Sequence, residues 1–186
     1  MRVVLWILGA LVAALGVLAA VIASRPDEFR IERSVSMAAP PDIVFGLVND
    51  FHKWEGWSPW AKLDPGMQIQ YDGPPSGVGA QYLWNGDKRV GEGRMAITQS
   101  KPNELVAVDL QFLKPFPAHN VATFTFAPDS AGTRVSWAMS GHSTFMGKAI
   151  GLIMNMDKLV GRQFEQGLAS LRTQAEGEAI QAQRSR

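Results

Sequence analysis

The sequence contains no cysteine, and this absence excludes several kinds of chemistry at once. Without thiols the chain forms no disulfide, has no thiolate nucleophile and cannot ligate zinc through sulfur. Histidine is also scarce, and the three that occur, His52, His119 and His142, are widely separated in the sequence and make a poor metal site. We therefore expect neither a metal nor a cofactor.

The chain also lacks an excess of either charge. It has 18 basic and 17 acidic side chains, with no block of like charge. Nucleic-acid binding needs a basic patch, so we expect no nucleic-acid partner. The common nucleophile, phosphate-loop and zinc motifs are missing as well. Gly91-Glu92-Gly93-Arg94-Met95-Ala96 fits G-x-G-x-x-A but lies inside a strand pattern; we interpret its glycines as room for a crossing aromatic side chain or a bulge.

One long uncharged run is present, from Val3 to Ala23. About 21 residues in a helix measure roughly 31 Å, the thickness of a bilayer's hydrocarbon core. We predict a single-pass transmembrane anchor over residues 1–24 and a linker over residues 25–28. A cleavable signal peptide ending at Ala23 is the alternative. Arginines flank both ends of the run, so the positive-inside rule leaves the side of the soluble domain open.

Small residues within this run suggest that two copies of the membrane helix pair with each other. Gly9 and Ala13, and likewise Gly16 and Ala20, have the spacing that lets two membrane helices pack closely. Weak homodimerisation is therefore a hypothesis, although such pairs also arise by chance in alanine-rich spans.

Residues 29–176 have the pattern of one α+β domain. Residues 29–37 alternate apolar and polar, as a half-buried strand does. A short helix then begins after Ala39, with prolines and Asp42 in its first turn. Six further strands are predicted at residues 67–71, 80–84, 90–99, 105–113, 121–126 and 133–140. Short connections between them favour an antiparallel meander with one apolar inner face.

A second helical pattern covers residues 143–176. Its apolar residues recur every three or four positions, so one face should be buried against the sheet. Glycines at 147, 151, 161 and 167 leave two interpretations. In the first, the glycines break the segment into two helices or let it lie close to the sheet. In the second, the flexible apolar residues at the start of the helix line a cavity. Residues 177–186 are predicted to be a frayed polar tail.

Three tryptophans occur within seven residues, at Trp54, Trp57 and Trp60, in a segment interrupted by Gly56 and Pro59. They are either core residues or the wall of an apolar pocket. We predict a pocket bounded by this segment, the inner face of the sheet and the first turns of the C-terminal helix. Its predicted lining is Trp54, Trp57, Trp60, Tyr82, Trp84, Met95, Val108, Leu110, Phe112, Phe124, Phe126, Trp137, Met139, Met146, Ile150, Ile153 and Met154.

Several short segments, in this order, resemble the START/Bet v 1-like superfamily, and within it the polyketide cyclase/dehydrase and lipid-transport branch. These segments are Trp57-Ser58-Pro59-Trp60-Ala61, Gly77-Val78-Gly79-Ala80, Gly132-Thr133-Arg134-Val135-x-Trp137 and Phe164-Glu165-x-Gly167-Leu168. The resemblance implies a helix-grip fold, in which a curved sheet surrounds the C-terminal helix and leaves a cavity for apolar ligands. It does not imply one reaction, because the superfamily includes binders, transporters and enzymes.

Three functions remain open at this point. The first is membrane-anchored binding or transport of a hydrophobic small molecule or lipid. The second is a cyclase/dehydratase-like enzyme, which is disfavoured because strand parity places no histidine on the apolar face and no catalytic residue can be named. The third is a structural interaction module whose tryptophans fill the core.

Overall fold

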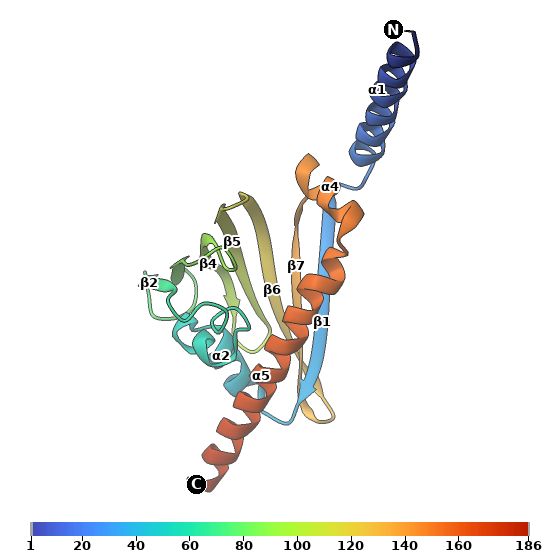
Figure 1. Cartoon of the computed structure of the whole chain (residues 1–186). Helices are drawn as coiled ribbons and strands as arrows, with labels where there is room; N and C mark the ends of the chain where they lie inside the picture. Colours follow the sequence, from blue (N-terminus) through green and yellow to red (C-terminus); the bar gives the residue numbers. More distant parts are fainter. Residues whose placement is uncertain (1, 186) are drawn as a thin grey trace.

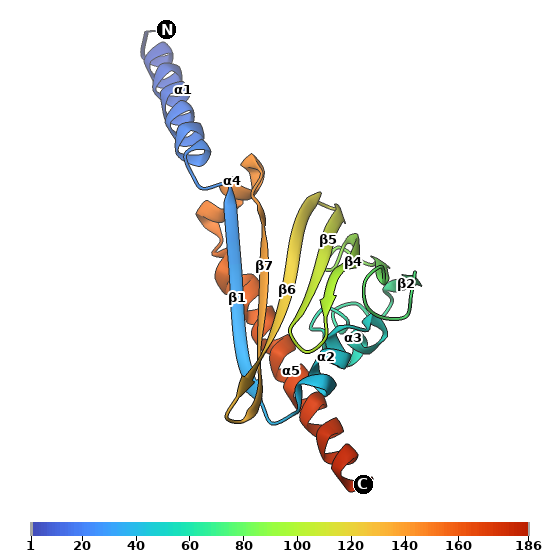
Figure 2. The same cartoon turned by 180° about the vertical axis from the view of Figure 1, so that it is seen from behind.

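In the computed structural model, which describes residues 2–185, a seven-stranded antiparallel sheet curves around a long C-terminal helix (Figures 1 and 2). The strands are β1 (Glu28–Met37), β2 (Gln68–Asp72), β3 (Gln81–Asn85), β4 (Glu92–Lys101), β5 (Leu105–Lys114), β6 (Ala118–Asp129) and β7 (Gly132–His142). Their spatial order is β1-β7-β6-β5-β4-β3-β2. β2 to β7 therefore form a meander, and β1 pairs with its last strand. The predicted α+β helix-grip fold is confirmed.

Five α-helices and one 3-10 helix accompany the sheet in the described residues. They are α1 (Arg2–Ala23), α2 (Pro41–Val48), the 3-10 helix η1 (Phe51–Lys53), α3 (Trp54–Trp57), α4 (Phe145–Ile153) and α5 (Met156–Arg184). α2 starts with Pro41 and carries Asp42 in its first turn, as the sequence indicates. It contacts β6, β7 and α5, so it closes one end of the space between helix and sheet.

The core lies between α5 and the concave face of the sheet. Strand alternation places apolar residues on this face as predicted, with Val106, Val108, Phe124, Val135 and Trp137 all buried. The apolar stripe of α5 faces them, and its members Phe164, Leu168, Leu171 and Ala175 are buried too.

The long C-terminal helical pattern is interrupted near Met154, in agreement with the two-helix interpretation. The side chain of Thr144 caps α4 by accepting a hydrogen bond from the Gly147 N–H (3.2 Å). The side chain of Asn155 caps α5 by accepting one from the Lys158 N–H (2.9 Å). Each cap satisfies a backbone donor that would otherwise have no partner. Asn155 at the cap and Asp157 in the first turn are typical of a helix start, although this start was not predicted from the sequence.

The structure corrects the expectation of a frayed tail over residues 177–186 as far as Ser185, whereas Arg186 lies outside the described residues. α5 continues to Arg184, and Ala179 remains buried in the core. The reason is periodicity, since Ala175 and Ala179 extend the apolar stripe by one further turn.

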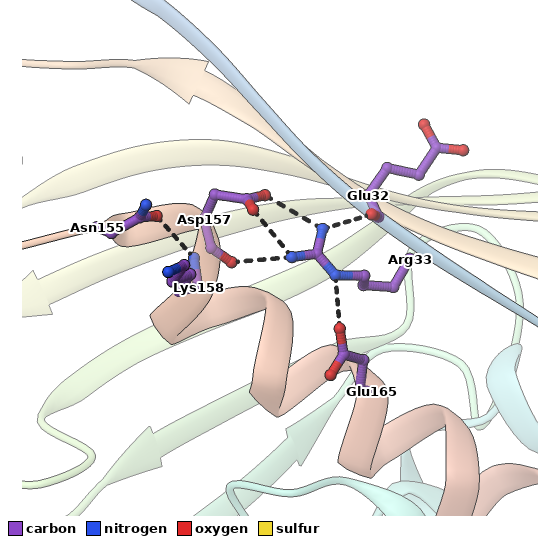
Figure 3. A network of polar contacts seen from close by, with 6 residues as sticks. All are labelled: Glu32, Arg33, Asn155, Asp157, Lys158 and Glu165. Carbon is purple, nitrogen blue, oxygen red and sulfur yellow. Dashed lines mark hydrogen bonds and ion pairs between the residues drawn. The ribbon is translucent and has the colours of Figure 1, made fainter.

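Arg33 of β1 holds the start of α5 against the edge of the sheet (Figure 3). Its two terminal nitrogens donate to the Asp157 carboxylate (3.1 and 3.0 Å), and Nε donates to Glu165 (2.8 Å). The remaining N–H groups donate to the backbone carbonyls of Glu32 (2.8 Å) and Asp157 (3.1 Å). All five guanidinium donors are thus used. The hydrogen bond from Arg33 lowers the pKa of Asp157.

This network requires a residue without a side chain at position 161. A Cβ atom on Gly161 would lie 2.5 Å from Arg33 Cζ and still closer to one terminal nitrogen. Such a distance is impossible for unbonded atoms, so a larger residue must displace the guanidinium. The glycine that costs helix propensity therefore allows the close approach between α5 and β1.

We predict that Gly161→Ala destabilises the fold, whereas Gly177→Ala stabilises it. Gly177 lies in the same helix with nothing within 4 Å of an added Cβ, so alanine there should raise the free energy of unfolding by up to about 1 kcal/mol. Gly161→Ala should lower it, because the Arg33 network is displaced. Denaturant unfolding of the full chain in detergent measures both.

An Arg33→Ala background provides the control for this prediction, because an added Cβ at position 161 would meet the whole end of the Arg33 side chain, including Nε (2.9 Å). Without the guanidinium, Gly161→Ala should lose its penalty and behave like Gly177→Ala. Equal stabilisation by both alanines in the unmodified chain would contradict the proposed role of Gly161.

Candidate functional site

A cavity of about 190 Å³ lies between α5 and the concave face of the sheet. Its walls come from α3 and the loop after it, from the inner faces of β2 to β7, and from the first turns of α5. Nearly all of its lining side chains are apolar or aromatic, and it is partly open to the surface. This composition suits an apolar molecule of modest size.

Part of the residue set predicted from the sequence lies at this cavity. These residues are Trp54, Trp60, Tyr82, Trp84, Met95, Leu110, Phe112, Trp137 and Met139. Their participation in ligand binding stays a prediction, which the position alone does not test.

Four other predicted residues belong to the hydrophobic core and not to the cavity lining. Val108, Phe124 and Phe126 lie on the inner face of the sheet, and Trp57 of α3 packs against Phe124 (6.0 Å between ring centroids). Phe126 packs edge-on against Phe45 of α2 (5.7 Å between ring centroids), and the indole N–H of Trp57 donates to the Leu47 carbonyl (3.1 Å). The α2 end of the space is therefore filled by α2 and α3, and the cavity occupies the other part.

The residues predicted from the start of the C-terminal helix lie away from this cavity. Met146, Ile150, Ile153 and Met154 are not among its lining residues. The helix is interrupted after Ile153, and α4 packs against α1. Val160 and Phe164, from the first turns of α5, take their place in the lining.

Further lining residues were not named from the sequence. They are Glu55, Ser58, Ala61, Met67, Ile69, Tyr71, Val90, Ala122, Val160 and Phe164. Some signal was available, because Ile69 and Tyr71 pair directly with Trp84 and Tyr82 and therefore share their face. Val160 and Phe164 belong to the helical stripe that the sequence assigned to the core.

Aromatic stacking forms the rigid back wall of the cavity. The ring of Phe164 on α5 stacks on Trp137 (4.2 Å between centroids, 7° between planes), and Phe124 also stacks on Trp137 (4.8 Å, 29°). Trp60 meets Trp137 edge-on at 5.6 Å. Such pairs contribute about 0.5–1.5 kcal/mol each beyond the burial of area.

The indole N–H groups near the cavity differ in whether they have a hydrogen-bond partner. Trp54 donates to the Val48 carbonyl (2.9 Å) and Trp84 to the Val90 carbonyl (3.1 Å). Among the described residues, Trp137 Nε1 is the buried side-chain nitrogen or oxygen without a hydrogen-bond partner. An unpaired buried donor costs roughly 1–3 kcal/mol.

The G-x-G-x-x-A segment contains a glycine that makes room for an aromatic side chain of the cavity wall. Gly93 pairs with Trp84 across β3 and β4, and a Cβ on Gly93 would overlap the Trp84 ring. The pairing of β4 with β5 also shifts register between Glu92 and Gly93. Both features predicted for this segment, a crossing aromatic side chain and a bulge, are therefore present.

Titratable groups at the cavity are few. Glu55 is exposed, and the two tyrosines, Tyr71 and Tyr82, lie side by side with centroids 5.6 Å apart. Burial raises the pKa of Tyr82 to about 12 and also raises that of Tyr71. Of the histidines, His52 stacks on Tyr71 (4.0 Å), and His119 pairs with Asp109 on the exposed face. The described residues contain no group of three or more acidic or histidine side chains placed to hold a metal.

We predict a separate, late ionisation of Tyr82. The chain has two tyrosines, so its alkaline absorbance titration should resolve into two steps, with the later one near pH 12. Because the pKa of Tyr82 is higher in the folded state, its contribution to stability is complete below about pH 10 and is lost as the pH rises toward 12. Tyr82→Phe should remove the later step and leave the earlier one. A single step at pH 10 would contradict the burial of this hydroxyl.

The curved antiparallel sheet, the long helix that it surrounds and the apolar cavity between them define a helix-grip protein. The chain belongs to the family described as polyketide cyclase / dehydrase and lipid transport, whose family model matches residues 28–176. The resemblance inferred from the sequence is thereby confirmed. Comparison with curated proteins finds no match.

Solved structures share this fold at low sequence identity. Protein CV1439 from Chromobacterium violaceum is 18% identical, with 81% of this chain and 99% of that chain covered and a TM-score of 0.56. The Aha1 dimer from Colwellia psychrerythraea is 16% identical over 80% and 96%, with a TM-score of 0.57. The di-domain ARO/CYC StfQ of the steffimycin biosynthetic pathway is 11% identical over 82% and 52%, with a TM-score of 0.60. At such identities the likeness shows the fold alone.

Proposed function

We propose that this protein is a membrane-anchored carrier or sensor that binds a hydrophobic small molecule or lipid in the helix-grip cavity. The observation that supports it most directly is the cavity itself, whose lining is almost entirely apolar or aromatic. Apolar walls of this kind favour a hydrophobic ligand.

The size of the cavity limits how such a ligand is held. At about 190 Å³ it is smaller than the 300 to 1,000 Å³ that is usual for drug-sized ligands. A larger lipid would place one part in the cavity and leave the remainder outside it. The family description, which includes lipid transport, agrees with a ligand of this kind.

The N-terminal helix supports the membrane part of the proposal. α1 has 22 residues, is long and apolar enough to span a membrane, and is almost wholly unburied by the rest of the chain. A core helix of a soluble protein would be buried, which favours the anchor. The chain leaves α1 at the sheet end where β1 begins and β7 finishes (Figures 1 and 2).

A cyclase/dehydratase-like reaction is the alternative, and the family description and the StfQ fold keep it open. Acid-base catalysis works best with groups whose pKa lies near the working pH. The pKa values of both cavity tyrosines are raised away from neutrality, and Glu55 is exposed at the cavity. These features favour binding over catalysis. Turnover of a bound polyketide by the full chain, lost in Glu55→Gln, would favour the enzyme.

We predict that ligand binding raises the melting temperature and alters tryptophan emission. A ligand at about one hundred times its dissociation constant should add roughly 2.7 kcal/mol of stability. A panel of fatty acids, isoprenoids and aromatic polyketides, tested by thermal unfolding and fluorescence, provides the measurement. Native mass spectrometry of the detergent-extracted protein tests for a co-purified ligand directly.

Two alanines on β6 supply matched variants for this test. Ala122 is buried and lines the cavity, whereas Ala127 is exposed. Ala122→Leu should fill part of the cavity and abolish the ligand-induced shift, and Ala127→Leu should leave the shift intact. If no ligand in the panel changes melting or emission in the unmodified chain, the structural-module interpretation replaces the carrier.

We predict that the full chain stays in membranes after a carbonate wash. The reason is that about 22 apolar helical residues match the hydrocarbon core of a bilayer. Release into the supernatant, or a mature N-terminus near Ser24, would instead identify α1 as a cleaved signal sequence.

A further inference from the structure

Exposed apolar side chains of the soluble domain gather at one end of the molecule. α4 has no buried residue, and Ile153 is 89% exposed and Phe145 55% exposed. Met154 and Met146 beside them are also exposed. Contiguous apolar surface of this kind on a folded domain marks a contact with a partner or a membrane.

A second exposed apolar residue group lies at the same end of the sheet. The β5–β6 loop carries Phe116, which is 68% exposed, next to the exposed Leu113. The antiparallel register pairs the start of β6 with the end of β7 and the end of β7 with the start of β1. The loop and α4 therefore lie at one end of the sheet, as both views show (Figures 1 and 2).

α4 is attached to the point where α1 ends. The Lys148 ammonium of α4 pairs with Asp27 and donates to the carbonyl of Ala23, the last residue of α1 (3.4 Å), while the N–H of Ser143 donates to the Asp27 carbonyl (2.6 Å). The Lys148 side chain is only 10% exposed. Ile22 is buried, and α1 contacts α4. These contacts hold α4 beside the exit of α1.

We propose that α4 and the Phe116 loop form a membrane-contacting face that inserts into the leaflet from which α1 emerges. We define this face as Phe116, Phe145, Met146, Ile153 and Met154. The proposal rests on the membrane anchorage proposed above, since a spanning α1 places its last turn, and with it α4, at the bilayer interface. The lipid leaflet is the occupant because the face continues the lipid-exposed surface of α1.

Apolar burial, and not charge attraction, supplies the binding. The five residues of the face are apolar, and the lysines beside them are paired: Lys148 with Asp27, and Lys114, two residues before Phe116, with Glu92 (2.6 Å). Interfacial helices that bind through apolar area depend on the depth of insertion, whereas basic ones depend on anionic lipid and salt. Insertion should therefore occur equally in zwitterionic and anionic vesicles and should persist at high salt.

Insertion would also determine how the cavity meets the membrane. Val90 and Phe112 line the cavity close to the end of β5, and Val160 lines it from the first turns of α5. This part of the lining belongs to the same end of the sheet as the membrane-contacting face. A hydrophobic ligand would then pass between leaflet and cavity over a short apolar path.

The lack of cysteine makes a direct test practical. Phe145→Cys, Ile153→Cys and, as a control, Ile180→Cys in the full chain would each be labelled with a polarity-sensitive fluorophore. Ile180 is 51% exposed and lies near the far end of α5. The proteins would be reconstituted into phosphatidylcholine vesicles, with and without phosphatidylglycerol, that contain chain-labelled quencher lipids.

We expect blue-shifted emission and quenching several-fold stronger at positions 145 and 153 than at position 180, independent of salt. Vesicle flotation separates the two proposals. If the protein floats with the vesicles but labels 145 and 153 respond as label 180 does, the membrane-contacting face is overturned and the anchor stands. If the protein does not float, the anchor fails and the membrane-contacting face fails with it.

Discussion

The stack of Phe164 on Trp137 is the contact on which the relation of helix, sheet and cavity depends. It joins α5 to the centre of the concave face, with the two rings nearly parallel at 4.2 Å. Phe124 supports Trp137 from within the sheet, and Trp60 meets it edge-on. Because rings of this size stand between helix and sheet, the two layers cannot close completely beside them. The cavity is the space left on the side where smaller residues, such as Ala122, meet the stack.

Two kinds of contact hold α5 against the sheet, one on each side of this stack. Toward the C-terminus, Leu168, Leu171 and Ala175 pack as an ordinary buried stripe. Toward the N-terminus the stripe weakens, and Arg33 holds the helix through polar contacts that use every guanidinium donor. These hydrogen bonds and ion pairs hold the helix beside the cavity without placing side chains in it. They explain how the space between α5 and the sheet can remain partly empty in a stable fold.

The two ends of the molecule differ in what they contain. At one end lie α1, α4 and part of the cavity lining, and at the other lie α2 and the C-terminal turns of α5. α2 fills its end with a packed core that includes Phe45 and Phe126. Selectivity in such a site would come from the shape of its apolar walls.

Local patterns in the sequence determined the class of fold and the apolar face of each strand. Alternation placed Met95, Leu110 and Trp137 on one face, and periodicity of three and four identified the stripe from Phe164 to Ala175. Both signals act over a few residues, so they can be read without knowing what packs against them. The uncharged run at the N-terminus is equally local, and length alone makes it a candidate membrane span.

Only the tertiary structure decided which residues of that face border the cavity and which are covered. Parity states that Phe126 and Leu110 face the same way, but not that α2 covers one and leaves the other at the cavity. The direction of α4 likewise depends on the Asn155 cap and on contacts with α1 and Asp27. The role of Arg33 was invisible for the same reason, since its partners lie more than a hundred residues away in the chain. Sequence periodicity records the side on which a residue is buried, whereas the partner that buries it is set by long-range packing.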